Sequence, residues 1–142
     1  MKHHVSTRLS CLFLAFLLIA AVGMLGACIE PYNPTEATIV ETKTVGTGGK
    51  TITVSVVNDK NEATLYTVKT DAEMLDRALL DHGIVEGEIG QYGLFITSAG
   101  GLVAEGNGWW GIYVGDRMTD TGASFIKVTD GGSYAVVYKV GW

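Results

Sequence analysis

The strongest constraint on the fold is a two-residue alternation of apolar and polar side chains in TITVSVV (51–57). In a β-strand this spacing places the aliphatic residues on one face and the hydroxyl residues on the other. The segment NDKN (58–61) has the composition of a turn, and ATLYTVKT (63–70) alternates again. The pattern therefore predicts a β-hairpin that buries one of its faces.

An amphipathic helix is predicted to follow at 70–83, TDAEMLDRALLDHG. Thr70 and Glu73 have the spacing of a capping box, in which both side chains satisfy backbone N–H groups of the first turn. Gly83 suits the left-handed position that commonly ends a helix. One face carries a mostly apolar stripe at helical spacing, made of Leu75, Ala78, Leu79 and His82.

The remainder of the chain has the pattern of short strands separated by glycine-rich turns. EGEIGQ (86–91) has the composition of a polar loop, and 118–132 that of a long irregular segment. Strands are predicted at 92–98, 102–105, 109–115 and 133–140. The predicted fold class is therefore α+β, with one α-helix packed on a mixed or antiparallel sheet of about five strands.

The N-terminus has the features of a secretory signal peptide. Lys2 and Arg8 precede an apolar run at 11–25, which is shorter than the roughly 20 residues that span a bilayer. The run ends in LGAC, which resembles the lipobox of bacterial lipoproteins and implies cleavage before Cys28 and lipid attachment to its sulfur. Cys11, the other cysteine, lies in the segment to be removed, which favours lipidation over a disulfide. An uncleaved membrane anchor is the alternative.

These features predict three segments. Residues 1–27 form a lipoprotein signal peptide, 28–49 a lipid-anchored flexible tether, and 50–142 the folded domain. The tether contains both prolines of the chain and no sustained hydrophobic period, although its TIV (38–40) also suits an edge strand. The predicted location is the cell membrane, lipid-anchored and facing the extracytoplasmic side.

The charge of the mature chain argues against a nucleic-acid partner. Removal of residues 1–27 takes away two of the ten Lys and Arg residues and none of the fifteen Asp and Glu residues, which leaves a net charge of −7. The basic residues that remain form no cluster, whereas phosphate groups need clustered cationic contacts. Contact with the membrane is therefore expected through the lipid rather than through charge.

Catalytic motifs are missing from the sequence, and the chain is not expected to be an enzyme. It has no Cys/His cluster at metal spacing, no HExxH, no CxxC and no GxSxG. His82, the one histidine after the signal peptide, lies near the end of the predicted helix, where it either caps the last carbonyls or binds a ligand or metal. Paired loop acids, Glu86 with Glu88 and Asp116 with Asp120, leave Ca²⁺ binding as a weaker alternative.

The adjacent tryptophans of NGWWGIYVGD (107–116) are the main indication of a binding site. Strand alternation places Trp109, Gly111 and Tyr113 on one face, so that two large rings flank a glycine and form a shallow slot. The opposite face, predicted to be core, carries Trp110, Ile112 and Val114.

Two aromatic residues of the preceding strand, Tyr92 and Phe95, lie on opposite faces, and Phe95 either extends the slot or belongs to the core. Trp109 either contacts a ligand or packs beneath the tether or the 118–132 segment. An aromatic surface with few charges suits a bulky, flat, partly apolar ligand, or serves as an anchor for a protein partner. The predicted ligand-binding residues are Trp109, Tyr113, Gly111, Phe95 and Tyr92.

Several motifs follow one another in a characteristic order along the domain. A helix that follows a hairpin precedes YGLFITSAGG, W-x-x-Y-V at 110–114, Gly122–Ser124, KVTDGG (127–132) and an aromatic final strand ending at Trp142. In this order, from about Thr51, the chain resembles the small C-terminal β-domain of the cobalamin carriers transcobalamin and intrinsic factor, and a related domain of bacterial lipoproteins. The resemblance implies a β-grasp-like fold and a cobalamin or other corrinoid ligand.

The chain departs from this family pattern in two turns and in its domain content. It has Gly115-Asp116 where relatives usually have Asn-Gly, and Asp130-Gly131-Gly132 where they usually have Asp-Gly-Asp. Both replacements still form turns. The carriers also have a larger helical domain that completes the corrinoid site, so the resemblance implies that this domain alone supplies half a site.

Two functions are consistent with the sequence. The first is capture of a corrinoid, or a similar bulky cofactor, by a surface-tethered protein that passes it to a membrane transporter or a second binding protein. The second is a protein–protein interaction module on the cell surface, which docks its partner by strand addition or through an anchor pocket. Neither function requires a covalently attached group other than the lipid.

Overall fold

The computed structural model describes residues 36–141. Contacts divide the chain into two units, Met1–Asn33 and Pro34–Trp142, and every described residue belongs to the second. The predicted signal peptide and the predicted lipidation site Cys28 lie outside the described residues. Within 36–141, no helix is both long enough and apolar enough to cross a membrane.

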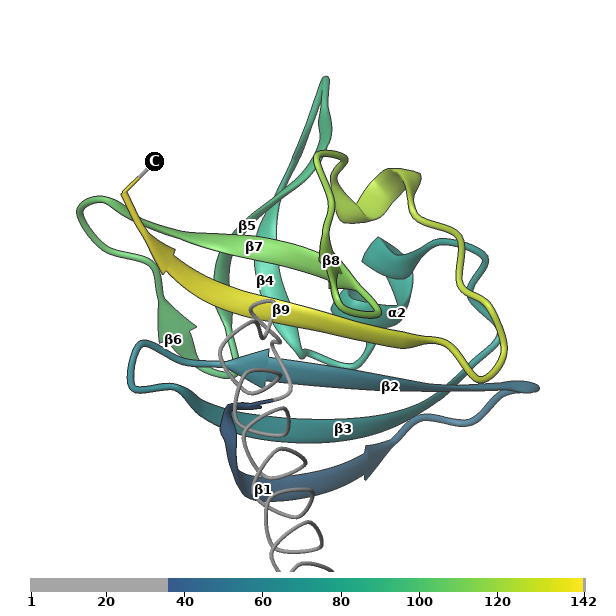
Figure 1. Cartoon of the computed structure of the whole chain (residues 1–142). Coiled ribbons are helices and arrows are strands. Elements are labelled where there is room, and N and C mark those ends of the chain that lie inside the picture. The colour runs from purple at the N-terminus through teal and green to yellow at the C-terminus, as the bar shows by residue number, and fades with distance from the viewer. Residues whose placement is uncertain (1–35, 142) are drawn as a thin grey trace, which may run out of the picture. The chain divides into compact units, whose positions relative to one another are not determined.

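The strands of this unit form two sheets, which have six and three strands (Figure 1). The larger, in the order β1-β3-β2-β9-β7-β8, contains β1 (Thr38–Val45), β2 (Lys50–Val57), β3 (Glu62–Thr70), β7 (Gly108–Val114), β8 (Arg117–Met118) and β9 (Ser133–Val140). The smaller contains β4 (Val85–Gly90), β5 (Gly93–Ala99) and β6 (Leu102–Val103). The other described elements are helix α2 (Leu75–Asp81) and the 3-10 turn η3 (Ala123–Phe125).

The hairpin predicted from the alternating segments is confirmed. β2 and β3 pair antiparallel along their whole length. Asn58 stabilises the turn between them, because its Oδ1 accepts hydrogen bonds from the N–H groups of Lys60 and Glu62, both at 2.9 Å. β9 adds parallel to β2, and β1 adds parallel to β3. Part of the segment expected as a tether therefore forms the edge strand that its TIV sequence also allowed.

The predicted fold class is wrong. An α+β, β-grasp-like arrangement of one helix on about five strands does not describe two sheets of six and three strands. The main cause is 86–91, whose glycines and glutamates predicted a loop. All of this segment except Gln91 belongs to β4 and pairs antiparallel with β5. Gly87 lies at a register shift in this pairing, where a Cβ atom would collide with the backbone oxygen of Phe95. The glycine is therefore a requirement of close strand approach rather than a sign of a loop.

The helix is confirmed in place but is shorter than predicted, and its predicted capping box is wrong. Helix α2 has seven residues, and its N-cap residue Met74 makes no side-chain capping bond. Thr70 Oγ1 instead accepts a hydrogen bond from the N–H of Ala72 at 3.0 Å, which turns the chain before the helix begins. The three aliphatic residues of the predicted stripe, Leu75, Ala78 and Leu79, are fully buried.

The predicted helix end at Gly83 is confirmed. Gly83 has a φ of 65°, and its N–H donates to the Leu80 carbonyl at 3.1 Å. A Cβ atom there would meet nothing within 4 Å, so alanine carries a conformational cost alone.

We expect Gly83→Ala to lower the free energy of unfolding by about 1–2 kcal/mol, measured by urea denaturation. Gly90→Ala is the matched control, because its surroundings are equally open and its backbone is not left-handed; equal losses at both positions would contradict the prediction.

The main core lies between the larger sheet and the layer formed by the smaller sheet and α2 (Figure 1). Trp110 and Ile112 belong to this core, as predicted. Val114, predicted to be core, is 40% exposed because it lies at the end of β7 beside the turn at Gly115. A second buried cluster, on the other face of the larger sheet, contains Ala37, Val57, Ala63, Tyr113, Ala135 and Val137.

Candidate ligand-binding cleft

The two adjacent tryptophans of β7 have different surroundings, as strand alternation predicts. Trp110 is 7% exposed and packs edge-on against Tyr138, with ring centroids 5.2 Å apart and ring planes at 85°. Its indole N–H is buried and has no hydrogen-bond partner among the described residues. Trp109 is half-buried, and its Nε1 donates to the Gly141 carbonyl at 2.6 Å. Trp110 is thus a core residue, whereas part of the Trp109 ring faces solvent.

The slot predicted between Trp109 and Tyr113 is filled by the protein's own side chains. A Cβ atom at Gly111 would lie 3.3 Å from Trp109 Cζ3, 3.4 Å from Met118 Sδ and 3.5 Å from Lys139 Cγ. Tyr113 is buried, and Lys139 Nζ lies 5.3 Å from the centroid of its ring. The glycine therefore gives room for packing among these side chains, and this face presents no open slot.

A cleft of about 250 Å³ instead brings together three of the predicted residues, Phe95, Trp109 and Gly111. Residues of β5 and β7 line it. These two strands belong to different sheets (Figure 1). Residues 119–122 border it, and the rest of the lining comes from Leu94, Ile96, Trp110 and Ile112. The cleft is therefore located where the two sheets approach each other without pairing.

The loop beside this cleft is held to the strands on either side. Asp76 of α2 is 8% exposed, and its Oδ2 accepts a hydrogen bond from Ser124 Oγ at 2.7 Å. Ser124 Oγ in turn accepts from the N–H of Leu94 in β5 at 2.9 Å. At the other end, the N–H of Thr119 donates to the Ile112 carbonyl of β7 at 2.8 Å. These bonds fix the position of 119–122 relative to both strands.

The remaining predicted residues, Tyr92 and Tyr113, do not line the cleft. Tyr92 lies in the turn of the β4–β5 hairpin, which projects beyond the rest of the fold (Figure 1), and is 81% exposed. With Phe95 it lines a shallow hollow of about 420 Å³ along hairpin residues 88–95. Phe95 thus borders both the cleft and the hollow, and Tyr113 borders neither.

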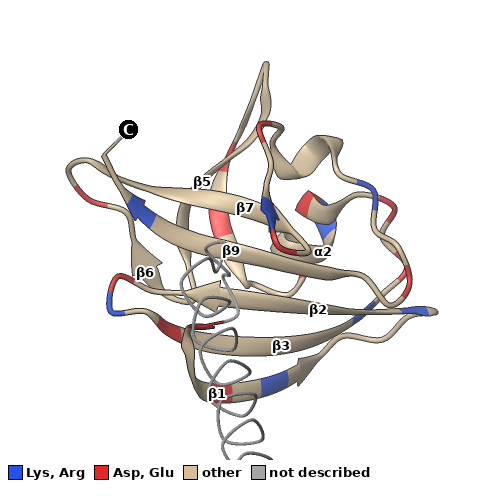
Figure 2. Cartoon of the chain, in the orientation of Figure 1, with Lys and Arg blue, Asp and Glu red and all other residues tan. Residues whose placement is uncertain are grey.

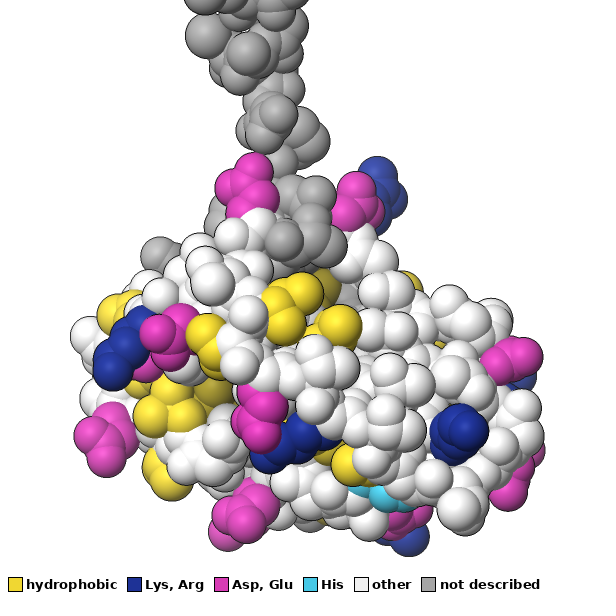
Figure 3. Space-filling model, turned by 90° about the horizontal axis from the view of Figure 1, so that it is seen from below, with side chains coloured by type: hydrophobic (Ala, Val, Ile, Leu, Met, Phe, Trp, Pro, Cys, Tyr) yellow, Lys and Arg dark blue, Asp and Glu magenta, His cyan; other side chains and the backbone are white. Residues whose placement is uncertain are grey.

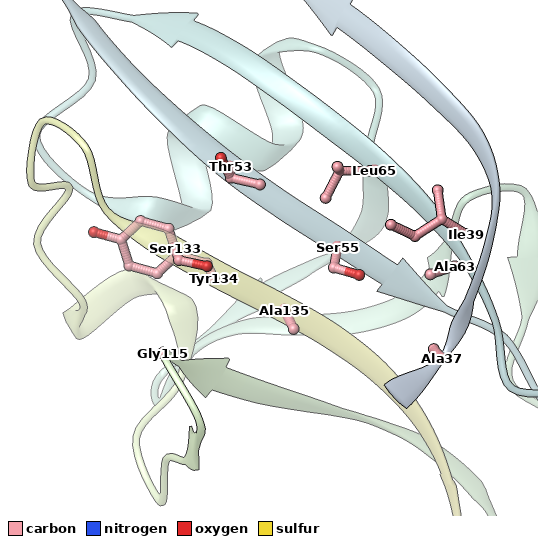
Figure 4. Close-up of a pocket in the computed structure, with 10 residues that line it drawn as sticks. All are labelled: Ala37, Ile39, Thr53, Ser55, Ala63, Leu65, Gly115, Ser133, Tyr134 and Ala135. Carbon is pink, nitrogen blue, oxygen red and sulfur yellow. The ribbon is translucent and has the colours of Figure 1, made fainter. Parts of the chain in front are cut away.

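A third cavity, of about 200 Å³, lies on the outer face of the larger sheet (Figure 4). Small side chains such as Ser55, Ala63 and Ala135 line it, and Ile39 of β1 and Leu65 of β3 border it. On the face that contains β1, hydrophobic side chains occur in separate places among polar and charged ones (Figure 3). This cavity has no charged residue in its lining and only one aromatic residue, Tyr134.

The segment that contributes β5 and β7 to the cleft contains acidic but no basic residues: between Arg77 and Arg117 lie Asp81, Glu86, Glu88, Glu105 and Asp116, and no Lys or Arg. The neighbouring strands do carry basic residues, Arg117 in β8 and Lys139 in β9 (Figure 2). Asp120 is the ionisable residue that lines the cleft. In the part of the chain from 36 to 141, no three or more His, Cys, Asp or Glu residues are grouped to hold a metal ion. His82 lies at the C-cap of α2, and its imidazole is beside Gly46.

Residues 119–122 were not identified by sequence reasoning, which placed them in a long irregular segment. The signal that would have found them is the turn at Gly115-Asp116, because a tight turn after β7 returns the chain along that strand. β8 does return beside β7, pairing Tyr113 with Met118. The residues that follow then lie next to the cleft.

Comparison with known proteins finds similar solved structures but no match to a family model or to a curated protein. One solved structure, of a Ruminococcus gnavus protein provisionally described as a metal binding protein, has 33% sequence identity and a TM-score of 0.64. The match covers 66% of this chain and 100% of that chain. Haptocorrin in complex with Cbi has 20% identity and a TM-score of 0.49, over 66% of this chain and 25% of that chain.

The described residues define a small two-sheet β-domain with an aromatic cleft between its sheets. Identity of 33% over the whole of the Ruminococcus gnavus chain is sufficient to establish relationship. The chain therefore belongs to the same protein family as that protein.

Proposed function

We propose that the chain is a surface-tethered extracytoplasmic lipoprotein that captures a bulky, flat, partly apolar ligand of the corrinoid type. The observation that carries this proposal is the β5–β7 cleft, which brings Phe95 and Trp109 to one opening beside residues 119–122. Exposed aromatic surface next to a few polar groups is typical of sites for such ligands. The corrinoid class itself rests on the sequence resemblance to the cobalamin carriers.

The size of the cleft supports partial rather than complete enclosure. Its volume of about 250 Å³ is below the ~300–1,000 Å³ of pockets that bury drug-sized ligands. A corrinoid would place one edge in the cleft and leave the rest outside it. A second protein, either a membrane transporter or another binding protein, would cover the remainder, and lipid attachment at Cys28 would keep the domain near such a partner.

Titration with cobinamide and cobalamin tests this proposal directly. A soluble fragment of residues 29–142 is suitable because it contains the whole of the unit Pro34–Trp142, which has its own core. We expect calorimetry and tryptophan fluorescence to detect binding with a Kd below about 1 mM. Trp109→Ala is expected to weaken this binding at least about tenfold, a loss of about 1.4 kcal/mol, because it removes an aromatic wall of the cleft.

Tyr92→Ala is the matched control, because it removes an exposed aromatic ring outside the cleft. It is expected to leave corrinoid affinity unchanged. A loss of binding in Tyr92→Ala equal to that in Trp109→Ala would move the site to the hairpin hollow. No binding of either corrinoid to the unsubstituted fragment would exclude the proposed ligand for the isolated domain.

A protein-docking function is the second candidate, and the β4–β5 hairpin favours it. Three large hydrophobic residues of this hairpin, Ile89, Tyr92 and Phe95, are more than half exposed, and so is Phe125 of η3. Exposed apolar groups that gather on one projection commonly mark an interaction surface. The same Tyr92→Ala variant separates the two functions, because it would disrupt docking at the hairpin and spare binding in the cleft.

A further inference from the structure

The cleft is bordered by two strand edges that have no strand partner. On the side of β7 opposite β9, pairing with β8 is confined to Tyr113 and Val114. On the side of β5 opposite β4, pairing with β6 is confined to Ser98 and Ala99. Along the rest of these edges, residues 108–112 of β7 and 93–97 of β5, no described strand is paired.

Strand alternation identifies the backbone groups that face the cleft. The Ile112 carbonyl points away from β9, since it accepts from the N–H of Thr119. The backbone N–H and C=O of Trp110, two residues earlier, point to the same side of the strand. The N–H of Leu94 points away from β4, since it donates to Ser124 Oγ. The backbone N–H and C=O of Ile96, two residues later, point to the same side of the strand. Trp110 and Ile96 both line the cleft. Each edge therefore offers an N–H donor and a C=O acceptor to whatever occupies it.

We propose that the cleft recognises its ligand through an uncharged carboxamide, which hydrogen-bonds to the open backbone edges at Trp110 and Ile96. A carboxamide presents one carbonyl acceptor and N–H donors in a plane, which is the complement of a strand edge. This inference rests on the proposed function, because it assigns the polar chemistry of a ligand in that same cleft. The apolar part of the ligand then contacts the rings of Phe95 and Trp109.

Charge in the cleft selects the amide over the corresponding acid. Asp120 is its one ionisable residue, and no Lys or Arg is part of its lining. A ligand carboxylate would lose its water without gaining a cation from the cleft lining, and it would be repelled by Asp120. A carboxylate also lacks the N–H donors that the two backbone carbonyls require.

Benzamide and benzoate are suitable probes, because they share an aromatic ring and differ in the group that the proposal concerns. Both would be titrated into ¹⁵N-labelled residues 29–142 and followed by the backbone amide signals. Benzamide is expected to shift the signals of Trp110 and Ile96 and to bind at least about tenfold more tightly than benzoate. Equal affinities, or no benzamide binding up to roughly 50 mM, would overturn the proposal.

Two variants test the role of charge. Asp120→Asn is expected to reduce the preference for benzamide over benzoate, whereas Asp116→Asn, an exposed acid outside the cleft lining, is expected to leave it unchanged. An equal reduction in both variants would refute the local charge effect. The outcome is independent of the corrinoid titration. If the domain binds corrinoids but does not prefer benzamide to benzoate, this inference alone is overturned. If it prefers benzamide but does not bind corrinoids, the proposed ligand alone is overturned.

Discussion

Alanine at Trp110 is expected to lower the free energy of unfolding by about 3–5 kcal/mol. The indole is 7% exposed, belongs to the main core and packs edge-on against Tyr138. An aromatic pair of this kind contributes about 0.5–1.5 kcal/mol beyond the burial of its area. The cavity left by the substitution cannot close easily, because β7 is fixed to β9 by antiparallel pairing along its length. Urea denaturation followed by circular dichroism measures the loss.

Trp109→Ala is the matched control, because it removes the same side chain from the neighbouring position of the same strand. It deletes the hydrogen bond to the Gly141 carbonyl and a ring that is only half-buried. Its expected cost is about 1 kcal/mol. Trp110→Phe keeps an aromatic ring and removes the buried N–H that lacks a partner among the described residues, so it should cost less than Trp110→Ala. If Trp109→Ala and Trp110→Ala had equal costs, the assignment of one ring to the core would be refuted.

Local periodicity was sufficient to predict most strands. The alternation in 51–57 and 63–70 depends only on which face of each strand is buried, so the hairpin could be inferred without knowing its neighbours. The same holds for the two faces of β7, where Trp110 is core and Trp109 is on the other face. The prediction for Val114 was wrong, because its exposure depends on how far the layer packed against β7 extends along the strand. Residue periodicity carries no information on that.

The division into two sheets could not be predicted, because strand partners are chosen by contacts between distant segments. Nothing local in β1 indicates that it pairs parallel with β3, and nothing local in β5 indicates that β7 is not its partner. β4 was mistaken for a loop because 86–91 has the polar, glycine-rich composition of one. The role of Gly87, to allow the close approach of Phe95, is visible only once the strands are paired.

Three of the residues that line the cleft were predicted from the sequence, but the geometry that brings them together was not. Aromatic residues around Gly111 were expected to form a slot on one face of one strand, and that position is filled by Met118 and Lys139. The opening lies instead at the edge of the same strand, where Trp109 meets Phe95 of the other sheet. Which side of a strand remains unpaired is a property of sheet topology, so alternation alone could not distinguish a face from an edge.

Replacement of Asp76 by alanine is expected to lower the free energy of unfolding by about 2–4 kcal/mol. One oxygen of this buried carboxylate accepts from the N–H of Arg77 and the other from Ser124 Oγ, both at 2.7 Å. The substitution leaves both donors without their acceptor inside the fold. Asp81→Ala is the control on the same helix, because Asp81 is exposed and lies at the negative end of the helix dipole. It should change stability by less than about 0.5 kcal/mol.

The same substitution is expected to affect the cleft, although Asp76 does not line it. Ser124 Oγ donates to the carboxylate and accepts from the N–H of Leu94, so loss of Asp76 removes the acceptor that orients this hydroxyl toward β5 and weakens the attachment of the loop at 119–122. Cobinamide affinity of the folded Asp76→Ala protein should therefore fall, whereas that of Asp81→Ala should not. A double-mutant cycle with Ser124→Ala separates this link from general destabilisation, because two groups in one hydrogen-bond network couple by about 0.5–3 kcal/mol. A coupling energy near zero would show that the carboxylate stabilises α2 alone and that the loop is positioned by its bond between Thr119 and Ile112.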